Sequence, residues 1–230
     1  MTRTALVTGG NRGIGLEVVK GYAEKGMKVI LACRDVEQAK ASLAGETMGD
    51  IHPITLDLSS HAAIDESCSK VTAIYGDIDV LVNNAGILHQ KQGTEASTEE
   101  LSESMQIHLN GPYNLIKQAL PAMLRNGFGR IINVSSGWGS FTEGMEGPLP
   151  YAVSKAALNA LTANLAKQLA ASGQNVTINS VCPGWVHTRM GGKDAPRTPE
   201  QGADTIVWLG TLESDCPNGK FLRDRQEISW

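Results

Sequence analysis

Cysteine is scarce in this chain of 230 residues, and its four copies stand far apart. Cys33, Cys68, Cys182 and Cys216 form no C-x-x-C pair, and no histidine follows them at zinc-finger spacing. This pattern indicates reduced thiols in a cytosolic setting and argues against both a disulfide framework and a metal site. A chain of this length needs no disulfide or metal cross-link to fold, because folding buries roughly 70% of the surface that the unfolded form exposes.

Long apolar runs and a one-sided charge are also missing. The first apolar run, Ala5-Leu6-Val7, is too short for the core of a signal peptide, and no stretch reaches the length of a membrane span. The formal net charge is −4 and no segment is strongly basic, which disfavours a nucleic-acid or anionic-membrane surface. These absences predict a cytoplasmic protein that binds neither nucleic acid nor membrane.

Short β-rich runs alternate with longer helical stretches along the whole chain. Strands are predicted at 4–8, 28–32, 51–56, 79–83, 130–135, 175–182 and 220–223, and helices at 14–25, 62–73, 99–124, 152–171 and 200–212. Some strands, such as the one with Val80, Leu81 and Val82, are apolar at consecutive positions, as in strands covered on both faces. The pattern predicts one α/β domain over residues 1–230, a doubly wound Rossmann domain whose parallel sheet of about seven strands is flanked by helices.

Glycines cluster directly after the first predicted strand, where a helix is also predicted to begin. The segment reads Thr8-Gly9-Gly10-Asn11-Arg12-Gly13-Ile14-Gly15. This G-x-x-x-G-x-G spacing lets the backbone turn tightly and approach a pyrophosphate at the helix N-terminus. A tight turn without a ligand is the alternative, but the position at the first strand–helix junction favours dinucleotide binding.

The end of the second strand bears on which nicotinamide cofactor is used. Asp35 stands about 20 residues after the glycines, where an acid suits the ribose hydroxyls of NAD. Cys33, however, occupies the strand tip, Arg34 follows it, and Arg12 projects from the glycine loop into the same neighbourhood. Two guanidinium groups favour a 2′-phosphate through charge-assisted contacts. We therefore predict NADP, with NAD as the alternative.

Tyr151 and Lys155 stand four residues apart at the start of a predicted helix, directly after Pro150. Positions i and i+4 share one helical face, so the two side chains are expected side by side. An ammonium stabilises a phenolate, and a lowered phenol pKa would let Tyr151 exchange protons at neutral pH. Ser136, at the tip of the fifth strand, is placed to donate to a carbonyl oxygen. A surface Tyr–Lys pair and a capping serine are the alternatives when each motif is taken alone.

Two more segments follow predicted strands and belong to the same crevice. Asn83-Asn84-Ala85-Gly86 ends the fourth strand, where small residues let the backbone approach a cofactor and a carboxamide can tie strands together. A simple turn is the alternative for this segment. Cys182-Pro183-Gly184-Trp185-Val186-His187-Thr188 follows the sixth strand, and its rigid turn can present backbone groups and the Thr188 hydroxyl to a carboxamide.

Taken together, these motifs resemble the short-chain dehydrogenase/reductase family, and in particular its compact, carbonyl-reductase-like members. The resemblance spans nearly the whole chain and includes Asp57 after the third strand. It implies an NADP(H)-dependent oxidoreductase that interconverts a ketone or aldehyde and an alcohol by hydride transfer, with Ser136, Tyr151 and Lys155 as catalytic residues. The cofactor-binding residues implied are Gly9, Asn11, Arg12, Gly13, Ile14, Gly15, Arg34, Asp57, Leu58, Asn84, Ala85, Gly86, Tyr151, Lys155, Pro183, Gly184, Val186 and Thr188.

One position departs from the family pattern. Members usually carry an asparagine two or three residues before a glycine, on the helix after the fourth strand, where it supports a proton-relay water. Here the segment reads Gln106-Ile107-His108-Leu109-Asn110-Gly111, which puts His108 in that place, and Asn110 fits only if the register slips. The predicted relay role of His108 would add a titration near neutral pH. A histidine merely packed or hydrogen-bonded in the helix is the alternative.

The loops at 137–150 and 186–199 are the candidate walls of the substrate site. Large apolar side chains on and near them predict a pocket for an apolar or aromatic carbonyl or alcohol: Trp138, Phe141, Met145, Trp185 and Met190. In the alternative interpretation, these side chains pack on the sheet.

Two other functions compete with an NADP-dependent carbonyl reductase. One is an NAD-linked alcohol or hydroxysteroid dehydrogenase, and the other is a non-catalytic, cofactor-sensing protein. The presence of both Tyr151 and Lys155 disfavours the second. Small residues along the helix after Tyr151 permit close approach of a neighbour, and the resemblance implies a homodimer or homotetramer.

Overall fold

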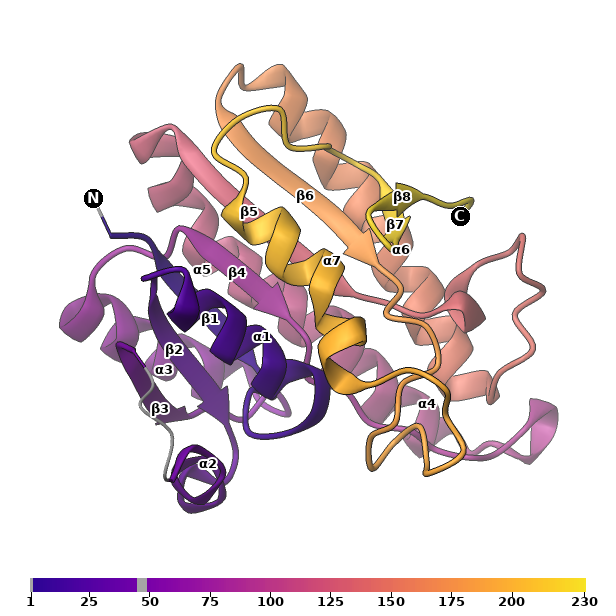
Figure 1. Ribbon diagram of the computed structural model, residues 1–230. Helices are drawn as coiled ribbons and strands as arrows, with labels where there is room; N and C mark the ends of the chain where they lie inside the picture. The colour runs from indigo at the N-terminus through magenta and orange to yellow at the C-terminus, as the bar shows by residue number, and fades with distance from the viewer. Residues whose placement is uncertain (1, 45–48) are drawn as a thin grey trace.

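The computed structural model describes residues 2–44 and 49–230. Within these ranges the strands form one eight-stranded sheet of order β3-β2-β1-β4-β5-β6-β7-β8 (Figure 1). The strands are β1 (Thr4–Thr8), β2 (Lys28–Cys33), β3 (Ile51–Thr55), β4 (Val80–Asn83), β5 (Phe128–Val134), β6 (Asn175–Val181), β7 (Phe221–Arg223) and β8 (Gln226–Glu227). Neighbours are parallel except β7 and β8. This order is that of a doubly wound Rossmann sheet, which confirms the predicted fold class.

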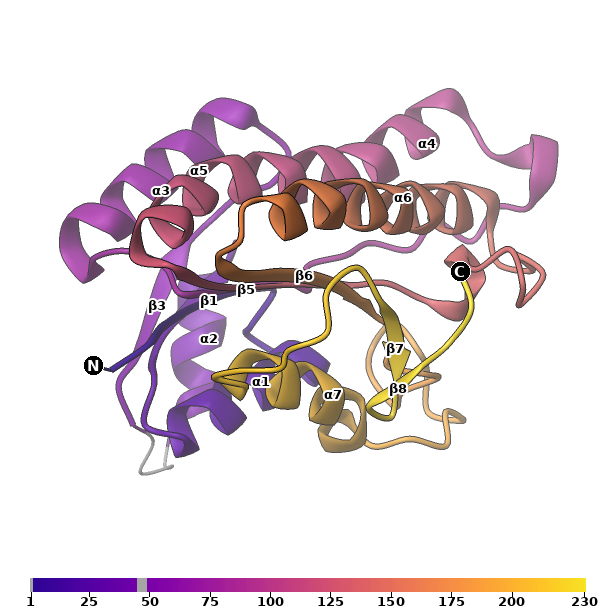
Figure 2. The same ribbon diagram turned by 90° about the horizontal axis from the view of Figure 1, so that it is seen from above.

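Helices cover both faces of the sheet (Figure 2). One layer holds α1 (Gly13–Glu24), α2 (Val36–Leu43) and α7 (Pro199–Thr211). The opposite layer holds α3 (His61–Tyr75), α4 (Thr98–Met105), α5 (Gly111–Asn126) and α6 (Leu149–Ala171). The shorter turns are η1 (Gly93–Glu95), η2 (Gln106–Asn110, a π-helical turn) and η3 (Gly137–Gly139).

The core consists of two apolar clusters, one on each face of the sheet. Val80 and Val82 lie in the cluster beneath α1 and α7, whereas Leu81 lies in the cluster beneath α3 and α5. Side chains alternate faces along a strand, so a consecutive apolar run supplies both layers. Fully burying each such side chain contributes about 1.5–3 kcal/mol. The sheet is therefore a rigid support for the loops at its ends.

Apart from the short turns η1 and η3 and shifts of up to three residues at element ends, the structure differs from the sequence-based elements in three places. The single helix predicted over 99–124 is divided into α4, η2 and α5, with His108 inside the π-helical turn. Helix α2 was not predicted, because its eight residues bury only Ala39 and so carry little apolar periodicity. The short antiparallel β8 was not predicted either, and it extends the sheet by one strand.

The order of the strands reverses between β1 and β4: the chain adds β2 and β3 on one side of β1 and then places β4 on its other side. Ligands of such sheets bind beyond the carboxyl ends of the strands at this switch point. No helix within the described ranges combines the length and apolarity needed to cross a membrane. No cluster of three or more potential metal ligands was found among the same residues.

Candidate active site

The glycine loop after β1 is built for close backbone approach. Gly9 has φ +65°, and its amide donates to the Ala32 carbonyl at 2.7 Å. A Cβ on Gly15 would lie 2.3 Å from the Gly9 carbonyl oxygen, so no side chain fits there. The loop leads directly into α1, whose first backbone N–H groups have no partner within the helix. This is the cradle that a pyrophosphate requires.

Asn84 fastens this loop to the end of β4. Its Nδ2 donates to the Thr8 carbonyl at 2.9 Å and to the Gly9 carbonyl at 3.2 Å. The Thr8 hydroxyl in turn accepts from the amides of Asn84 and Ala85, each at 3.0 Å. Asn83 joins β4 to β5 through its amide, which donates to Asn133 Oδ1 at 2.8 Å. The carboxamides therefore tie the strands together, as the sequence indicated.

Three arginines lie close enough around the loop to influence one another's charge. The pKa of Arg12 is lowered by partial burial first, and then by the charges of Arg189 and Arg34. None of these three guanidinium groups makes a hydrogen bond or ion pair with any residue that the structure describes. Arg189, which follows Thr188, was not predicted from the sequence. Thr188 lies at the glycine loop, since a Cβ on Gly13 would lie 3.1 Å from the Thr188 methyl group.

The acids near β2 and β3 are engaged locally. The Asp35 carboxylate accepts from the Gln38 amide at 3.0 Å and caps the N-terminus of α2. Asp57 accepts from the Ser59 amide and hydroxyl, and these bonds, with a smaller contribution from Arg34, lower its pKa. The carboxylate that would favour NAD is therefore occupied as a helix cap.

The remaining residues predicted near the adenosine half make protein contacts. Leu58 is buried, and its carbonyl accepts from Gln106 Nε2 at 2.8 Å. The Asn11 side chain donates to Gln38 Oε1, which connects the glycine loop to α2.

Ser136, Tyr151 and Lys155 meet beyond the end of β5. Tyr151 and Lys155 lie in the first turns of α6, and both are buried. The Ser136 hydroxyl lies close enough to the Tyr151 phenol to lower its pKa, against the larger effect of burial. Lys155 Nζ donates to the Val134 carbonyl at 2.7 Å and lies 5.6 Å from the centre of the Tyr151 ring. The predicted group is therefore assembled in one place.

The electrostatics of this group differ from the sequence expectation. Burial raises the pKa of Tyr151 to about 12, and burial lowers the pKa of Lys155 to about 7. Removing a group from water penalises its charged form, which is the phenolate for Tyr151 and the ammonium for Lys155. The chain's own residues thus keep the phenol protonated at neutral pH instead of bringing its pKa toward 7.

His108 also lies in this group, but its titration differs from the prediction. The imidazole is 1% exposed, and its ring packs edge-on against Tyr151 with centroids 5.3 Å apart. Burial, with the charges of Lys155 and His89, holds its pKa well below the usual 6.5. It therefore remains neutral near pH 7, and the predicted titration near neutral pH is wrong.

The turn after β6 packs against the start of α1 and against α7. Gly184 has φ +78°, as the Pro183–Gly184 turn requires. Val186 is buried, and both it and Ile14 contact the position of Gly202 in α7. The Thr188 hydroxyl accepts from the Gly191 amide at 3.0 Å, which shapes the following loop.

Aromatic and sulfur-containing side chains border the site. The Trp138 ring lies 6.0 Å from the Tyr151 ring, edge-on, and remains 42% exposed. The Met190 methyl group lies 3.8 Å from where a Gly86 Cβ would be. Trp185 and Phe141 are more exposed, at 58% and 75%. Trp138 therefore borders the Tyr151 ring and Met190 the turn at Gly86, while Phe141 points largely to solvent.

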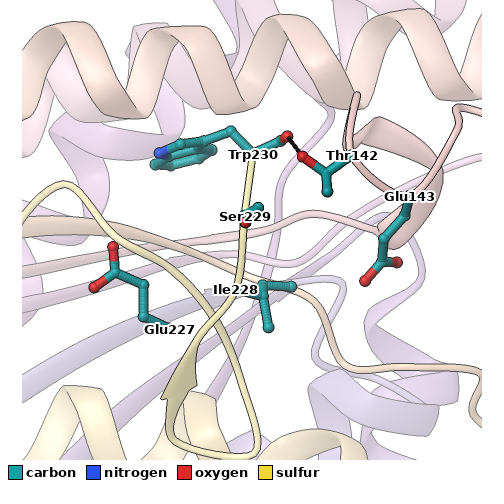
Figure 3. Close-up of a pocket in the computed structure, with 6 residues that line it drawn as sticks. All are labelled: Thr142, Glu143, Glu227, Ile228, Ser229 and Trp230. Atoms are coloured by element: carbon teal, nitrogen blue, oxygen red, sulfur yellow. Dashed lines mark hydrogen bonds between the residues drawn. The ribbon is translucent and has the colours of Figure 1, made fainter.

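The last residues of the chain hold the loop that follows Ser136. Thr142 Oγ1 donates to the Trp230 carbonyl at 2.9 Å (Figure 3), and Ser140 Oγ donates to the Ser229 carbonyl at 3.1 Å. A surface hollow of about 690 Å³ lies beside them and contains none of the predicted site residues. It is lined by Thr142, Glu143, Glu227, Ile228, Ser229 and Trp230.

Comparison with known proteins agrees with this geometry. The family model described as short chain dehydrogenase matches residues 3–198. The chain is 30% identical to the protein named carbonyl reductase [NADPH] 1 of Sus scrofa, over 100% of this chain and 94% of that protein. Among solved structures it is similar to the carbonyl reductase Sniffer of D. melanogaster, with a TM-score of 0.87, 29% identity and full coverage of both chains.

A second solved structure, the NADPH-bound carbonyl reductase from chicken fatty liver, superposes with a TM-score of 0.88 at 28% identity, over 100% of this chain and 99% of that one. The chain belongs to the short-chain dehydrogenase family, whose members are oxidoreductases that use nicotinamide cofactors.

Proposed function

We propose that this protein is an NADP(H)-dependent carbonyl reductase that interconverts a ketone or aldehyde and the corresponding alcohol. The observation that carries the proposal is the grouping of Ser136, the Tyr151 phenol and the buried Lys155 amine in one place, next to an open glycine loop. The resemblance to carbonyl reductases from pig, fly and chicken supports the same reaction.

The residues present fit a dinucleotide. The glycine loop leaves no room for side chains, and the unpartnered α1 amides and three unpaired guanidinium groups match a pyrophosphate and a further phosphate. Ala85 and Gly86 would line the nicotinamide half, and the Thr188 loop would close over it. The bound nicotinamide supplies a hydride donor or acceptor at C4.

The preference for NADP rests on the carboxylate of Asp35. In an NAD site an acid at the end of β2 accepts from the ribose hydroxyls. Here Asp35 instead accepts from the Gln38 amide, and Cys33 at the strand tip offers no carboxylate. Arg12 and Arg34 are exposed on either side of this place. Their charges favour a 2′-phosphate over a bare ribose.

The catalytic work of the chain is to polarise a carbonyl and deliver a proton. Ser136 Oγ donates to the substrate oxygen, which increases the positive charge at the carbonyl carbon. Tyr151 donates its phenolic proton to the same oxygen as the alcohol forms. Because its pKa is raised to about 12, the phenol is fully protonated at neutral pH and ready to act as the acid. This favours reduction as the working direction.

Lys155 stabilises the phenolate that proton donation leaves behind. Its amine lies beneath the Tyr151 ring, and its pKa of about 7 leaves a substantial charged fraction at neutral pH. Its bond to the Val134 carbonyl fixes the amine at the end of β5.

The apolar side chains that border the site indicate the substrate class. Trp138 offers apolar surface beside the Tyr151 ring, and Met190 offers it beside Gly86, which suits an apolar or aromatic carbonyl compound.

The experiment that tests the function is NADPH oxidation by the purified protein across a panel of aliphatic, aromatic and ketoester carbonyls. Wild-type turnover that disappears in Tyr151→Phe supports the proposal. Absence of turnover above the Tyr151→Phe background with every carbonyl overturns it, and equal turnover with NADH favours an NAD-linked dehydrogenase instead.

A further inference from the structure

Histidine 108 connects the two halves of the site, and both of its ring nitrogens are engaged. The Ile87 amide donates to His108 Nε2 at 3.0 Å. A backbone amide can only donate, so Nε2 carries no proton and acts as the acceptor. The proton of the neutral ring is therefore on Nδ1, which lies 2.8 Å from Ser154 Oγ.

The hydrogen bonds continue from Ser154 into the catalytic helix. Ser154 accepts from His108 Nδ1–H and donates its own proton to the Tyr151 carbonyl at 2.9 Å. The hydrogen bonds then run in one direction, from Ile87 through His108 and Ser154 to Tyr151, and each donor in this series has an acceptor. No ring nitrogen is left to hold a relay water.

Two packing contacts reinforce this arrangement. A Cβ on Gly86 would lie only 3.1 Å from His108 Nε2, so a side chain there would crowd the imidazole. The imidazole also packs edge-on against the Tyr151 ring. The π-helical turn η2, rare in regular helices, orients His108 so that it makes these contacts at once.

We propose that His108 is a positioning residue, held as the neutral Nδ1–H tautomer, that fixes Tyr151 relative to the cofactor-lining turn Asn84–Ile87. This inference rests on the proposed function for its kinetic consequence, but not for the tautomer. The turn is bonded to the glycine loop through Asn84, so the imidazole connects the cofactor cradle to the catalytic phenol.

The charged and titratable groups around His108 favour the neutral ring. Lys155 on α6 and His89 after β4 both act against a second ring proton, and Tyr151 presents a neutral phenol. Protonating Nε2 would also break the bond from the Ile87 amide and leave that amide without its acceptor.

The first arm of the test needs no activity. In protein labelled with ¹⁵N-histidine, long-range ¹H–¹⁵N spectra distinguish protonated from unprotonated ring nitrogens, and His108→Gln assigns the signals by their loss. We expect an Nδ1–H, bare-Nε2 ring that is unchanged from pH 5.5 to 8. An Nε2–H tautomer, or a ring that titrates within this range, overturns the proposal whether or not the protein is an enzyme.

The second arm separates positioning from proton relay. His108→Gln offers an amide acceptor and donor without a titratable ring, whereas His108→Leu offers neither. We expect His108→Gln to keep kcat within about threefold with an unchanged pH profile, and His108→Leu to lose about 10- to 100-fold, as a small misplacement of the reacting groups does. His61→Gln, an exposed histidine at the start of α3, is the matched control.

The outcomes of the second arm are distinct. Equal losses in His108→Gln and His108→Leu, with both variants shown to be folded by circular dichroism, contradict positioning through these bonds. A wild-type ionisation near 6.5 that disappears in His108→Gln contradicts it in favour of a relay. Absence of wild-type turnover would count against the proposed function, and the spectra would then decide the tautomer alone.

Discussion

Lys155 Nζ donates a hydrogen bond to the Val134 carbonyl at 2.7 Å, inside a site where the amine is almost fully shielded from water. One bond to a neutral carbonyl does not offset the loss of hydration, so the pKa of the amine falls to about 7. The amine that the proposed mechanism uses therefore lowers the stability of the fold.

Replacing this amine is expected to stabilise the protein while removing activity. The unfolded chain holds the Lys155 proton up to about pH 10.4 and the folded chain only up to about 7, so unfolding takes up a proton between these values. The free energy of unfolding then rises with pH across this window, and the penalty is complete below pH 7. Lys155→Met should raise stability at pH 7 by on the order of 2 kcal/mol and flatten the rise.

Urea unfolding of both proteins at pH 7, 8 and 9 measures this difference. The raised pKa of Tyr151 affects stability only above pH 10, where the unfolded phenol begins to ionise, so it does not confound the window. Lys167→Met, on the exposed side of the same helix, controls for loss of a lysine. Equal pH slopes for wild type and Lys155→Met would show that the amine is not desolvated.

The raised pKa of Tyr151 predicts different pH profiles for the two directions of reaction. Reduction uses the protonated phenol, which persists to about pH 12, whereas oxidation needs the phenolate as base. We expect kcat/KM for alcohol oxidation to rise from pH 7 to 10. The kcat/KM for carbonyl reduction should show no matching pH dependence over this range. An oxidation profile that is flat or falls over this range would be inconsistent with a buried, protonated phenol.

The three unpaired arginines should set the affinity for NADPH. Arg12→Gln and Arg34→Gln are each expected to weaken NADPH binding about 10-fold with little effect on NADH, because each removes a charge-assisted contact to a phosphate. Arg189→Gln should also weaken NADPH binding, because the Arg189 guanidinium lies close enough to Arg12 for its charge to lower the pKa of Arg12. Fluorescence titration with both cofactors measures these affinities.

Two variants serve as controls for the arginines. Arg125→Gln removes an arginine on α5 that pairs with Asp77, far in sequence from the loop, and should leave both cofactors unaffected. Asp35→Ala removes the cap of α2 and should cost about 1 kcal/mol of stability without improving NADH binding. A switch toward NADH on losing Arg34 but not Arg12 would limit the phosphate site to one arginine.

The contact between Trp138 and Tyr151 predicts a role in substrate binding. Trp138→Ala should raise KM for aromatic ketones about 10-fold more than for small aliphatic ketones, because it removes apolar surface beside the phenol. Phe141→Ala, from a side chain 75% exposed on the same loop, is the matched control and should change neither. Equal changes of KM in Trp138→Ala and Phe141→Ala would show that the loop, and not the Trp138 ring, determines the preference for aromatic ketones.

Much of this architecture was predictable because strong local signals coincide with it. Strand β1 was predicted with its observed bounds, and the glycine loop and the Tyr151–Lys155 spacing are short-range patterns. Arg189 was missed because only the tertiary fold brings the loop after β6 against the loop after β1. The environment of His108 was missed for the same reason, since burial and the Ile87 amide, not sequence neighbours, decide its protonation.

The proposed function depends most directly on hydride transfer to the carbonyl carbon, together with proton donation by Tyr151 to the carbonyl oxygen. NADPH carrying deuterium at the transferred C4 position, reacted with an aromatic ketone, should place one deuterium on the alcohol carbon of the product, as read by mass spectrometry. Tyr151→Phe should still bind NADPH, yet form at least about 100-fold less deuterated alcohol. Alcohol formed without deuterium, or formed equally by Tyr151→Phe, would contradict the account.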